Sequence, residues 1–328
     1  YREGDWGSTP ENYAKFYGAA VASNDKINCY RSPFHDGPVS YQEIYDCFDA
    51  MIDENIEMVQ QGKDVNFFDK FVTYHDDEPD TPEKWASTLT FDTDFHNAIN
   101  ALKDKLNDYP ELKESFINQR CVCPYNRDIE DVDFNALTNP APTYDYLDTE
   151  SQRETSHENF EHVWWYGCIL PYLPYPTFQL DGSLTGIRML TYMQYNYDIE
   201  GSIYWNLCYC QRKDNVGDPY DVDLWTDPLT WGNGSCDGRL SYPGTKYGIL
   251  GPITTQRLEE IVASFEDYEY FVLIEQKLGS REEALELISN TMHFSSFFNG
   301  TQLTISTTNN KNFVTYRQNL LNIIDGLY

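Results

Sequence analysis

The chain has 328 residues, and its 41% hydrophobic content is enough for one large domain or two ordinary ones. Lys and Arg total 23 against 53 Asp and Glu, and the resulting net charge of −30 argues against nucleic acid or an anionic membrane surface as a partner, because both bind basic surfaces. No run of about 18 apolar residues is present, so membrane insertion is not expected.

Helix signals and strand signals alternate along the chain. Thr9-Pro10 is typical of a helix start, Ser40 and Glu43 fit a capping box, and Gly279 is placed to end a long helix. Apolar periodicity and helix-end signals predict helices over 11–22, 44–59, 184–195, 255–278 and 312–325, and the polar stretch over 150–161 is compatible with a helix. Further helical segments are opened by Thr81-Pro82, by Thr93 and by Ser280. Runs of β-branched and aromatic residues predict strands over 26–30, 71–75, 116–123, 143–147, 162–168 and 201–208.

This alternation predicts a parallel sheet with helices outside it. We expect an α/β fold, namely a (β/α)8 TIM-like barrel that occupies residues 1–328 and lacks its first two strands. Those strands would lie before Tyr1, in a removed or separate N-terminal segment that completes the barrel. An open doubly wound sheet is the alternative, although no Gly-rich phosphate-binding loop follows an early strand.

An acidic turn follows the strand predicted over 71–75. Asp76, Asp77 and Glu78 come directly after the strand, and Pro79 ends its hydrogen bonding because proline has no backbone N–H. Catalytic residues of α/β barrels lie at this carboxyl end of the strands, and paired carboxylates are the usual equipment for cleaving a glycosidic bond. The stretch therefore predicts either a catalytic pair or a solvated acidic turn.

The 26 Tyr and 7 Trp, together with the many acids, favour a neutral or cationic polyhydroxyl ligand, because sugar rings stack on aromatic side chains and carboxylates bind hydroxyls. Candidate contacts lie on or after predicted strands, where barrel enzymes place them. On the strands, either Tyr74 or His75 and either Trp165 or Tyr166 are expected to face a pocket. Further candidates at strand ends are Trp205, Asn206, Arg31 and His35.

The eight cysteines contain no C-x-x-C pair. Cys121 and Cys123, like Cys208 and Cys210, lie two apart on predicted strands, so each pair projects to one face. This pattern favours buried thiols over a zinc site or a disulfide framework. We expect neither a metal nor a cofactor, and a Ca²⁺ site in the acid-rich loop over 214–227 lacks the regular spacing of an EF-hand.

Three stretches together resemble a known family. They are the acids that end at Pro79, the run Val163-Trp164-Trp165-Tyr166, and Arg188 followed by 201–206, Tyr242-Pro243-Gly244 and the helix over 257–270. In this order they resemble the catalytic barrel of the family-123 glycoside hydrolases and the related bacterial domain of unknown function. The resemblance covers nearly the whole chain and implies a β-N-acetylgalactosaminidase with substrate-assisted, retaining chemistry. It also implies an N-terminal β-sandwich domain, which we do not expect within these 328 residues.

In substrate-assisted cleavage, the 2-acetamido oxygen of the sugar itself attacks the anomeric carbon. The resemblance implies that Glu78 is the general acid/base and that Asp77 orients and stabilises the acetamido group. Asp76 receives no catalytic role, and we expect either a structural role or a charge that further separates the proton affinities of Asp77 and Glu78. Arg188 is either a site residue or a salt-bridge residue, and 267–270 should be packing on the C-terminal helix.

Two other functions fit the same residues. A conventional two-carboxylate glycosidase would need an acid from another strand, such as Asp181, opposite Glu78. A non-catalytic carbohydrate-binding or surface-assembly protein could use the same barrel. In each case a glycan or glycoconjugate is the expected partner, and acidity suits secretion or the cell surface, although a cytoplasmic enzyme would have the same residues.

Overall fold

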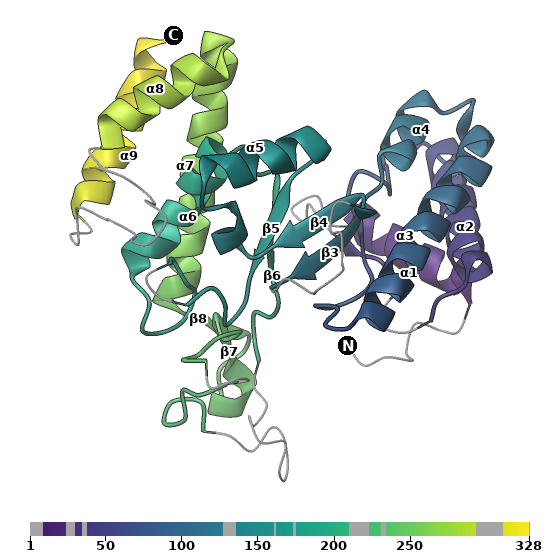
Figure 1. Cartoon of the computed structure of the whole chain (residues 1–328), viewed down its shortest axis with the longest axis horizontal. Coiled ribbons are helices and arrows are strands. Elements are labelled where there is room, and N and C mark those ends of the chain that lie inside the picture. Colours follow the sequence, from purple (N-terminus) through teal and green to yellow (C-terminus); the bar gives the residue numbers. More distant parts are fainter. Residues whose placement is uncertain are drawn as a thin grey trace. The chain divides into compact units, whose positions relative to one another are not determined.

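The computed structural model describes residues 9–23, 30–34, 38–126, 136–160, 162–172, 175–209, 223–230, 234–292 and 311–327. The chain divides into two compact units, Tyr1–Ala141 and Pro142–Tyr328, which are described separately (Figure 1). Each contains helices and a small sheet with parallel strand pairs, so the fold class is mixed α/β. The described residues contain no complete eight-stranded barrel, and the single barrel domain over 1–328 stays a prediction.

Unit 1 is a four-stranded sheet with helices packed on it. Its strands are β1 (Tyr30–Arg31), β2 (Phe71–Tyr74), β3 (Cys121–Tyr125) and β4 (Asn139–Pro142), and they lie in the order β1-β2-β3-β4. The first pairs are parallel, with Tyr30 opposite Phe71 and Thr73 opposite Cys121. The helices are α1 (Pro10–Ser23), α2 (Tyr41–Gln60), α3 (Pro82–Leu102) and α4 (Pro110–Ile117), with a short 3-10 turn over Lys103–Leu106.

An aromatic cluster holds these helices to the sheet. Phe48 of α2 is fully buried and contacts Phe71 of β2, Phe95 of α3 and Phe116 of α4, with ring centroids 5.9, 5.4 and 5.4 Å away. All of these contacts are edge-on, the arrangement that aromatic quadrupoles favour. Burying one such side chain contributes about 1.5–3 kcal/mol, so this cluster fixes which face of β2 points toward the helices.

Unit 2 combines a parallel strand pair, a hairpin and a helical layer. Its strands are β5 (Trp164–Gly167), β6 (Gly201–Tyr204) and the antiparallel hairpin of β7 (Ser241–Pro243) and β8 (Pro252–Thr254). Thr143 forms an isolated parallel bridge to Tyr166 of β5. The helices are α5 (Glu150–Asn159), α6 (Leu184–Asn196), α7 (Gln256–Leu278), α8 (Arg281–Met292) and α9 (Lys311–Gly326), with 3-10 turns over Tyr144–Leu147 and Gly244–Tyr247.

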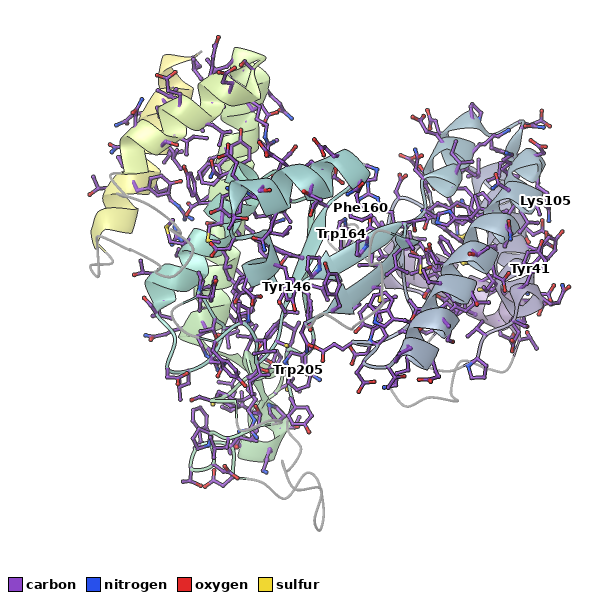
Figure 2. All side chains as sticks on the ribbon, viewed as in Figure 1. Tyr41, Lys105, Tyr146, Phe160, Trp164 and Trp205 are labelled. Atoms are coloured by element: carbon purple, nitrogen blue, oxygen red, sulfur yellow. The ribbon has the colours of Figure 1, made fainter. Side chains whose placement is uncertain are left out.

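A close backbone approach sets the start of the β5–β6 pair. Trp164 lies opposite Gly201, and its indole covers the glycine so closely that an added Cβ would lie 2.1 Å from the ring. Trp164 and Trp205, both labelled in Figure 2, lie at opposite ends of the pair, because Trp205 follows the last residue of β6. Glycine is therefore required at position 201 for the two strands to align as they do.

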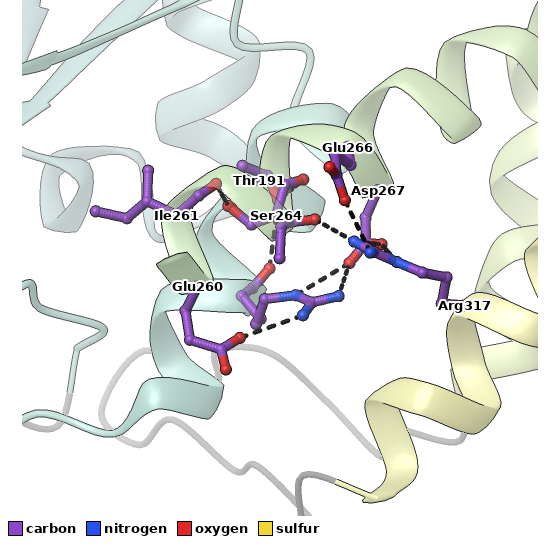
Figure 3. Close-up of polar contacts among 9 residues, drawn as sticks. Thr191, Glu260, Ile261, Ser264, Glu266, Asp267 and Arg317 are labelled. Atoms are coloured by element: carbon purple, nitrogen blue, oxygen red, sulfur yellow. Dashed lines mark hydrogen bonds and ion pairs between the residues drawn. The ribbon is translucent and has the colours of Figure 1, made fainter. Parts of the chain in front are cut away.

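A buried carboxylate joins three helices of unit 2. Asp267 of α7 accepts from Nε of Arg188 on α6 at 3.1 Å and from Nε of Arg317 on α9 at 2.8 Å (Figure 3). Each arginine also pairs with a glutamate of α7. Nη1 of Arg188 lies 3.2 Å from Oε2 of Glu260, and Nη1 of Arg317 lies 2.8 Å from Oε2 of Glu266. Arg188 is therefore a salt-bridge residue, and Asp267 has the packing role expected from the sequence.

Local capping signals placed most helices correctly. Ser40 and Glu43 form the predicted capping box, the Thr81 and Thr255 side chains cap α3 and α7, and Gly279 ends α7 in the left-handed conformation. The predictions over 116–123 and 143–147 were wrong in part. Phe116 belongs to α4 and Tyr144–Leu147 is a 3-10 turn, while Thr93 lies inside the continuous helix α3.

The cysteine prediction was correct for one pair and wrong for part of the other. The free thiols of Cys121 and Cys123 are buried, whereas that of Cys208 is exposed, and Cys210 lies outside the described residues. β6 ends at Tyr204, four residues before Cys208, so this cysteine does not lie on a strand. Among the described helices, none has both the length and the apolar character needed to cross a membrane.

Candidate active site

Strand β2 leads into the acidic turn, and burial alternates along it from one residue to the next. Phe71, Thr73 and His75 are buried, whereas Val72 and Tyr74 between them are half-buried. The buried face packs toward the helices, because Phe71 contacts Phe48 and the ring of His75 stacks on Phe91 of α3 at 3.8 Å. Tyr74 therefore lies on the opposite face of the strand.

Asp76 is tied into the helical layer. Its Oδ2 accepts from the Thr88 hydroxyl at 2.5 Å and lies 2.9 Å from Nδ1 of His75. His75 is only 1% exposed, so it has almost no surface to offer a ligand. These contacts fix the first residue of the turn against α3 and give Asp76 the structural role expected from the sequence.

Asp77 and Glu78 differ from Asp76 in both exposure and backbone. Asp77 is exposed, and one of its carboxylate oxygens accepts a hydrogen bond from the Tyr74 hydroxyl. Glu78 is half-buried and has φ of +47°, in the left-handed region that costs a non-glycine residue roughly 1 kcal/mol. Such backbone strain is concentrated at functional sites. The turn therefore holds two neighbouring carboxylates, one of them oriented by a phenol, just beyond a parallel strand.

A cavity of unit 1 lies away from the acidic turn. A cavity of about 840 Å³ is lined by residues that precede β2, including Asn66, Asp69 and Lys70, and by Ser115 of α4. These residues lie at the amino end of the strand, whereas the acids follow its carboxyl end. This cavity is therefore separate from the acidic turn, since Asp76, Asp77 and Glu78 are not among its lining residues.

Unit 2 contains the aromatic candidates. Trp165 is 1% exposed and packs edge-on against Tyr144 at 5.6 Å within the core beneath α6, so it offers no surface for a sugar. Tyr166 is also buried, and the Cys168 thiol lies 3.9 Å from its hydroxyl. Trp205 and Asn206 are half-buried just beyond β6, and Asn206 accepts from the Cys208 backbone N–H at 2.8 Å.

The remaining sequence candidates are scattered. Arg31 ends β1 opposite Val72, one strand away from the acidic turn, and His35 lies outside the described residues. Asp181 is exposed on the turn before α6. Among the proposed ligand contacts, Tyr74 is joined to the acid pair, because its hydroxyl donates a hydrogen bond to Asp77.

A buried acid that the sequence did not indicate lies beside Trp205. Asp237 is 2% exposed and accepts hydrogen bonds from Nε1 of Trp205 at 2.7 Å and from the Tyr204 hydroxyl at 2.8 Å. Burial raises the pKa of Asp237 above its ordinary value, against the opposing effect of these two hydrogen bonds and of Arg257. The dipeptide Asp237-Gly238 is a turn signal in the sequence, but it does not indicate that Asp237 is bonded to Tyr204 and Trp205.

Parallel strands under helices define an α/β protein, and two neighbouring carboxylates lie beyond the carboxyl end of one of these strands. The sequence matches the family described as "Glycoside hydrolase 123, catalytic domain" over residues 38–274, which is most of the chain, and the protein belongs to this family. The acid pair, Trp205 and Asp237 all lie within the matched region.

One solved structure is reported as "The details of glycolipid glycan hydrolysis by the structural analysis of a family 123 glycoside hydrolase from Clostridium perfringens". It is similar to this chain with a TM-score of 0.46 and 13% sequence identity, over 89% of this chain and 45% of that one. The chain thus spans less than half the length of that protein. A comparison with curated proteins gave no match.

Proposed function

We propose that this protein is a glycosidase that removes β-linked N-acetylgalactosamine, or a related 2-acetamido sugar, from a glycan or glycoconjugate. Membership of a glycoside hydrolase family supports the reaction class. The observation that carries the proposal is the pair Asp77 and Glu78 immediately beyond β2, with Asp77 oriented by the Tyr74 hydroxyl.

The proposed reaction is substrate-assisted and retains the anomeric configuration. The 2-acetamido oxygen attacks the anomeric carbon as the bond to the leaving oxygen breaks, and Glu78 gives its proton to that oxygen. The ionised Asp77 carboxylate accepts a hydrogen bond from the acetamido N–H and stabilises the positive charge that develops on the cyclic intermediate. Glu78 then takes a proton from a water that attacks the anomeric carbon, which restores the acetamido group and the protonated acid.

The site candidates of the two units take different proposed roles. Tyr74 orients Asp77, while His75 is too buried for a sugar contact and instead positions Asp76. Trp205 and Asn206 are half-buried at the end of β6 and are the proposed sugar contacts of unit 2. We propose no sugar contact for Trp165, because it is enclosed in the core.

For the fold, we propose that the strands belong to a (β/α)8-type barrel. Within unit 1, adjacent strands follow sequence order, and the β1–β2 and β2–β3 pairs are parallel. Within unit 2, β5 and β6 are adjacent in sequence and also pair in parallel, with α6 between them along the chain. Sequential parallel order with intervening helices is the connectivity of such barrels.

The test is hydrolysis of chromogenic β-glycosides of N-acetylgalactosamine, N-acetylglucosamine and galactose by the wild type, Asp77→Asn and Glu78→Gln. We expect turnover of 2-acetamido sugars only, reduced by roughly 10²–10⁴-fold in both variants. Asp80→Asn is the matched control, since Asp80 is an exposed acid of the same turn that pairs with Lys84 at 2.6 Å. This surface pair contributes about 0–1 kcal/mol, so the control should keep its activity.

Other outcomes would replace the proposal. Turnover of the galactoside would indicate an enzyme nucleophile and a conventional two-carboxylate mechanism. A wild type that is folded by near-UV circular dichroism, binds sugar and hydrolyses nothing would indicate the non-catalytic carbohydrate-binding alternative.

A further inference from the structure

A threonine of helix α3 holds the first residue of the acidic turn. Thr88 is 1% exposed, and its hydroxyl lies 2.5 Å from Oδ2 of Asp76 and 2.9 Å from the carbonyl oxygen of Lys84. The hydroxyl carries one proton, so it donates to one of these acceptors at a time, and the carboxylate is the stronger acceptor. A side chain of α3 is thereby joined to the residue that directly precedes the acid pair.

A second side chain approaches the same carboxylate oxygen. Nδ1 of His75 lies 2.9 Å from Oδ2 of Asp76, and the His75 ring stacks on Phe91 with an interplanar angle of 13°. Phe91 and Thr88 both belong to α3, so this helix holds Asp76 directly through Thr88 and indirectly through His75. The Asp76 side chain is 14% exposed, so little water competes for these contacts.

The other end of the turn is also attached to α3. Pro79 is buried, and the Thr81 hydroxyl accepts from the Lys84 N–H at 3.3 Å and so caps the helix. Asp80 pairs with the Lys84 ammonium at 2.6 Å. The acid pair therefore lies in a short segment that one helix holds at both ends.

Glu78 has a backbone conformation that needs such support. Its φ of +47° is uncommon for residues other than glycine, and a conformation of this kind persists only where the surrounding structure holds it. If the contact to Asp76 were lost, residues 76–78 could relax toward ordinary backbone angles. The carboxylates of Asp77 and Glu78 would then point in new directions.

We propose that Thr88 is a positioning residue that acts through Asp76 to fix the direction in which Asp77 and Glu78 present their carboxylates. This inference rests on the proposed function, because it takes these two acids as the groups that act on the sugar. Their proposed roles are exerted in the transition state, and a displacement of about 1 Å can cost about 100-fold in rate. Loss of the Thr88 contact should therefore lower kcat more than it raises KM.

The first variant is Thr88→Val, because valine keeps the branched shape of threonine and lacks the hydroxyl. We expect kcat on the N-acetylgalactosaminide to fall by roughly 10- to 100-fold, with KM within about threefold of the wild type. Thr88→Ser keeps the hydroxyl and should restore most of the lost kcat. Wild-type kcat in Thr88→Val, or a serine variant as slow as the valine variant, would overturn the inference.

Two other threonines of unit 1 are matched controls. The exposed Thr93 donates to the carbonyl oxygen of Leu89 at 2.9 Å, so Thr93→Val removes the same kind of backbone contact from the same helix. Thr73 of β2 is fully buried, and its hydroxyl has no hydrogen-bond partner within the described part of the chain. Thr73→Val therefore removes a buried hydroxyl without breaking a bond. Both controls should keep wild-type kcat, and a loss in either equal to that of Thr88→Val would overturn the specific role of Thr88.

A double-mutant cycle tests whether Thr88 acts through Asp76. Asp76→Ala removes the acceptor, so Thr88→Val should lower kcat much less in the Asp76→Ala background than in the wild type. Equal losses of kcat in the two backgrounds would mean that Thr88 acts independently of Asp76, contrary to the inference.

Crystal structures of the wild type and Thr88→Val distinguish this inference from the proposed function, because they report the turn without requiring activity. We expect Asp77 and Glu78 to move relative to α3, with the remaining helices and strands of unit 1 unchanged. If the wild type hydrolyses no glycoside but the turn moves in Thr88→Val, the proposed function fails and the positioning role of Thr88 is supported. If the wild type is active and Thr88→Val changes neither kcat nor the turn, only this inference fails. An inactive wild type together with an unmoved turn would overturn both.

Discussion

The Tyr74 hydroxyl donates a hydrogen bond to the carboxylate of Asp77, three residues further along the chain. Hydrogen bonds to charged groups contribute about 1.5–3 kcal/mol, so Tyr74→Phe should lower kcat/KM on the N-acetylgalactosaminide by roughly 10- to 100-fold. Steady-state rates across substrate concentrations measure this effect. Little change in thermal stability is expected, because Asp77 is exposed.

Tyr109→Phe is the matched control. Its hydroxyl also takes part in a side-chain hydrogen bond of unit 1, accepting from Gln60 at 2.9 Å, but Tyr109 lines the cavity at the amino end of β2. This variant should retain wild-type kcat/KM. Equal losses in the two variants would show that Tyr74 acts through the stability of the unit and not through Asp77.

Two substitutions at Glu78 distinguish the effect of its carboxylate on activity from the effect of its backbone conformation on stability. Because φ is +47°, Glu78→Gly removes both the carboxylate and the left-handed strain, whereas Glu78→Ala removes only the carboxylate. Both variants should be inactive, and the glycine variant should be more stable than the alanine variant by about 1 kcal/mol. Thermal or denaturant unfolding of the pair measures the difference. A less stable glycine variant would contradict the strained conformation.

Asp267 should be needed for the helical layer of unit 2 and dispensable for chemistry. Asp267→Asn leaves Arg188 and Arg317 without their shared carboxylate, and breaking a buried ion pair costs about 3–5 kcal/mol. We expect a large fall in the unfolding temperature, with wild-type kcat for protein that remains folded. Glu266→Gln removes the half-exposed member of the cluster and should cost no more than about 1 kcal/mol.

Asp92 predicts a pH dependence of stability. Burial raises its pKa above the ordinary 3.8, against hydrogen bonds from Thr138 and Cys121 and the charge of His96. The folded state therefore binds this proton more tightly than the unfolded state, and the stabilisation is complete below 3.8 and lost as pH rises through the folded value. Relative to Asp92→Asn, which does not titrate, the wild type should lose unfolding free energy with rising pH. A constant difference would contradict this.

Sequence predicted those elements whose signals are local. The Ser40–Glu43 box and Gly279 lie within one turn of the helix ends that they specify. The start of the strand predicted over 116–123 was wrong, because Leu112 and Phe116, four residues apart, are both buried on α4, whose first turn contains Pro110. An apolar pair at that spacing was a helix signal, and the apolar residues that follow it concealed the boundary.

The site was predictable to the same extent. Asp77 and Glu78 stand directly after an apolar strand, so their position at its end could be derived from adjacent residues. The contacts of Asp237 could not, because its partners Tyr204 and Trp205 lie more than 30 residues earlier, across a long loop. Burial of Trp165 depends on its packing against Tyr144, again a relationship between separate segments.

The contact between Trp164 and Gly201 disfavours every register of β5 and β6 except the native one. Shifting β6 by one residue would place Ser202 or Glu200 under the indole, and either side chain would collide with a ring that lies almost on bare backbone. Only the native alignment fits the flat ring. A short strand pair with few hydrogen bonds thereby acquires a unique register, and the residues at its far end, Tyr204 and Trp205, are delivered to the same place in every molecule that folds.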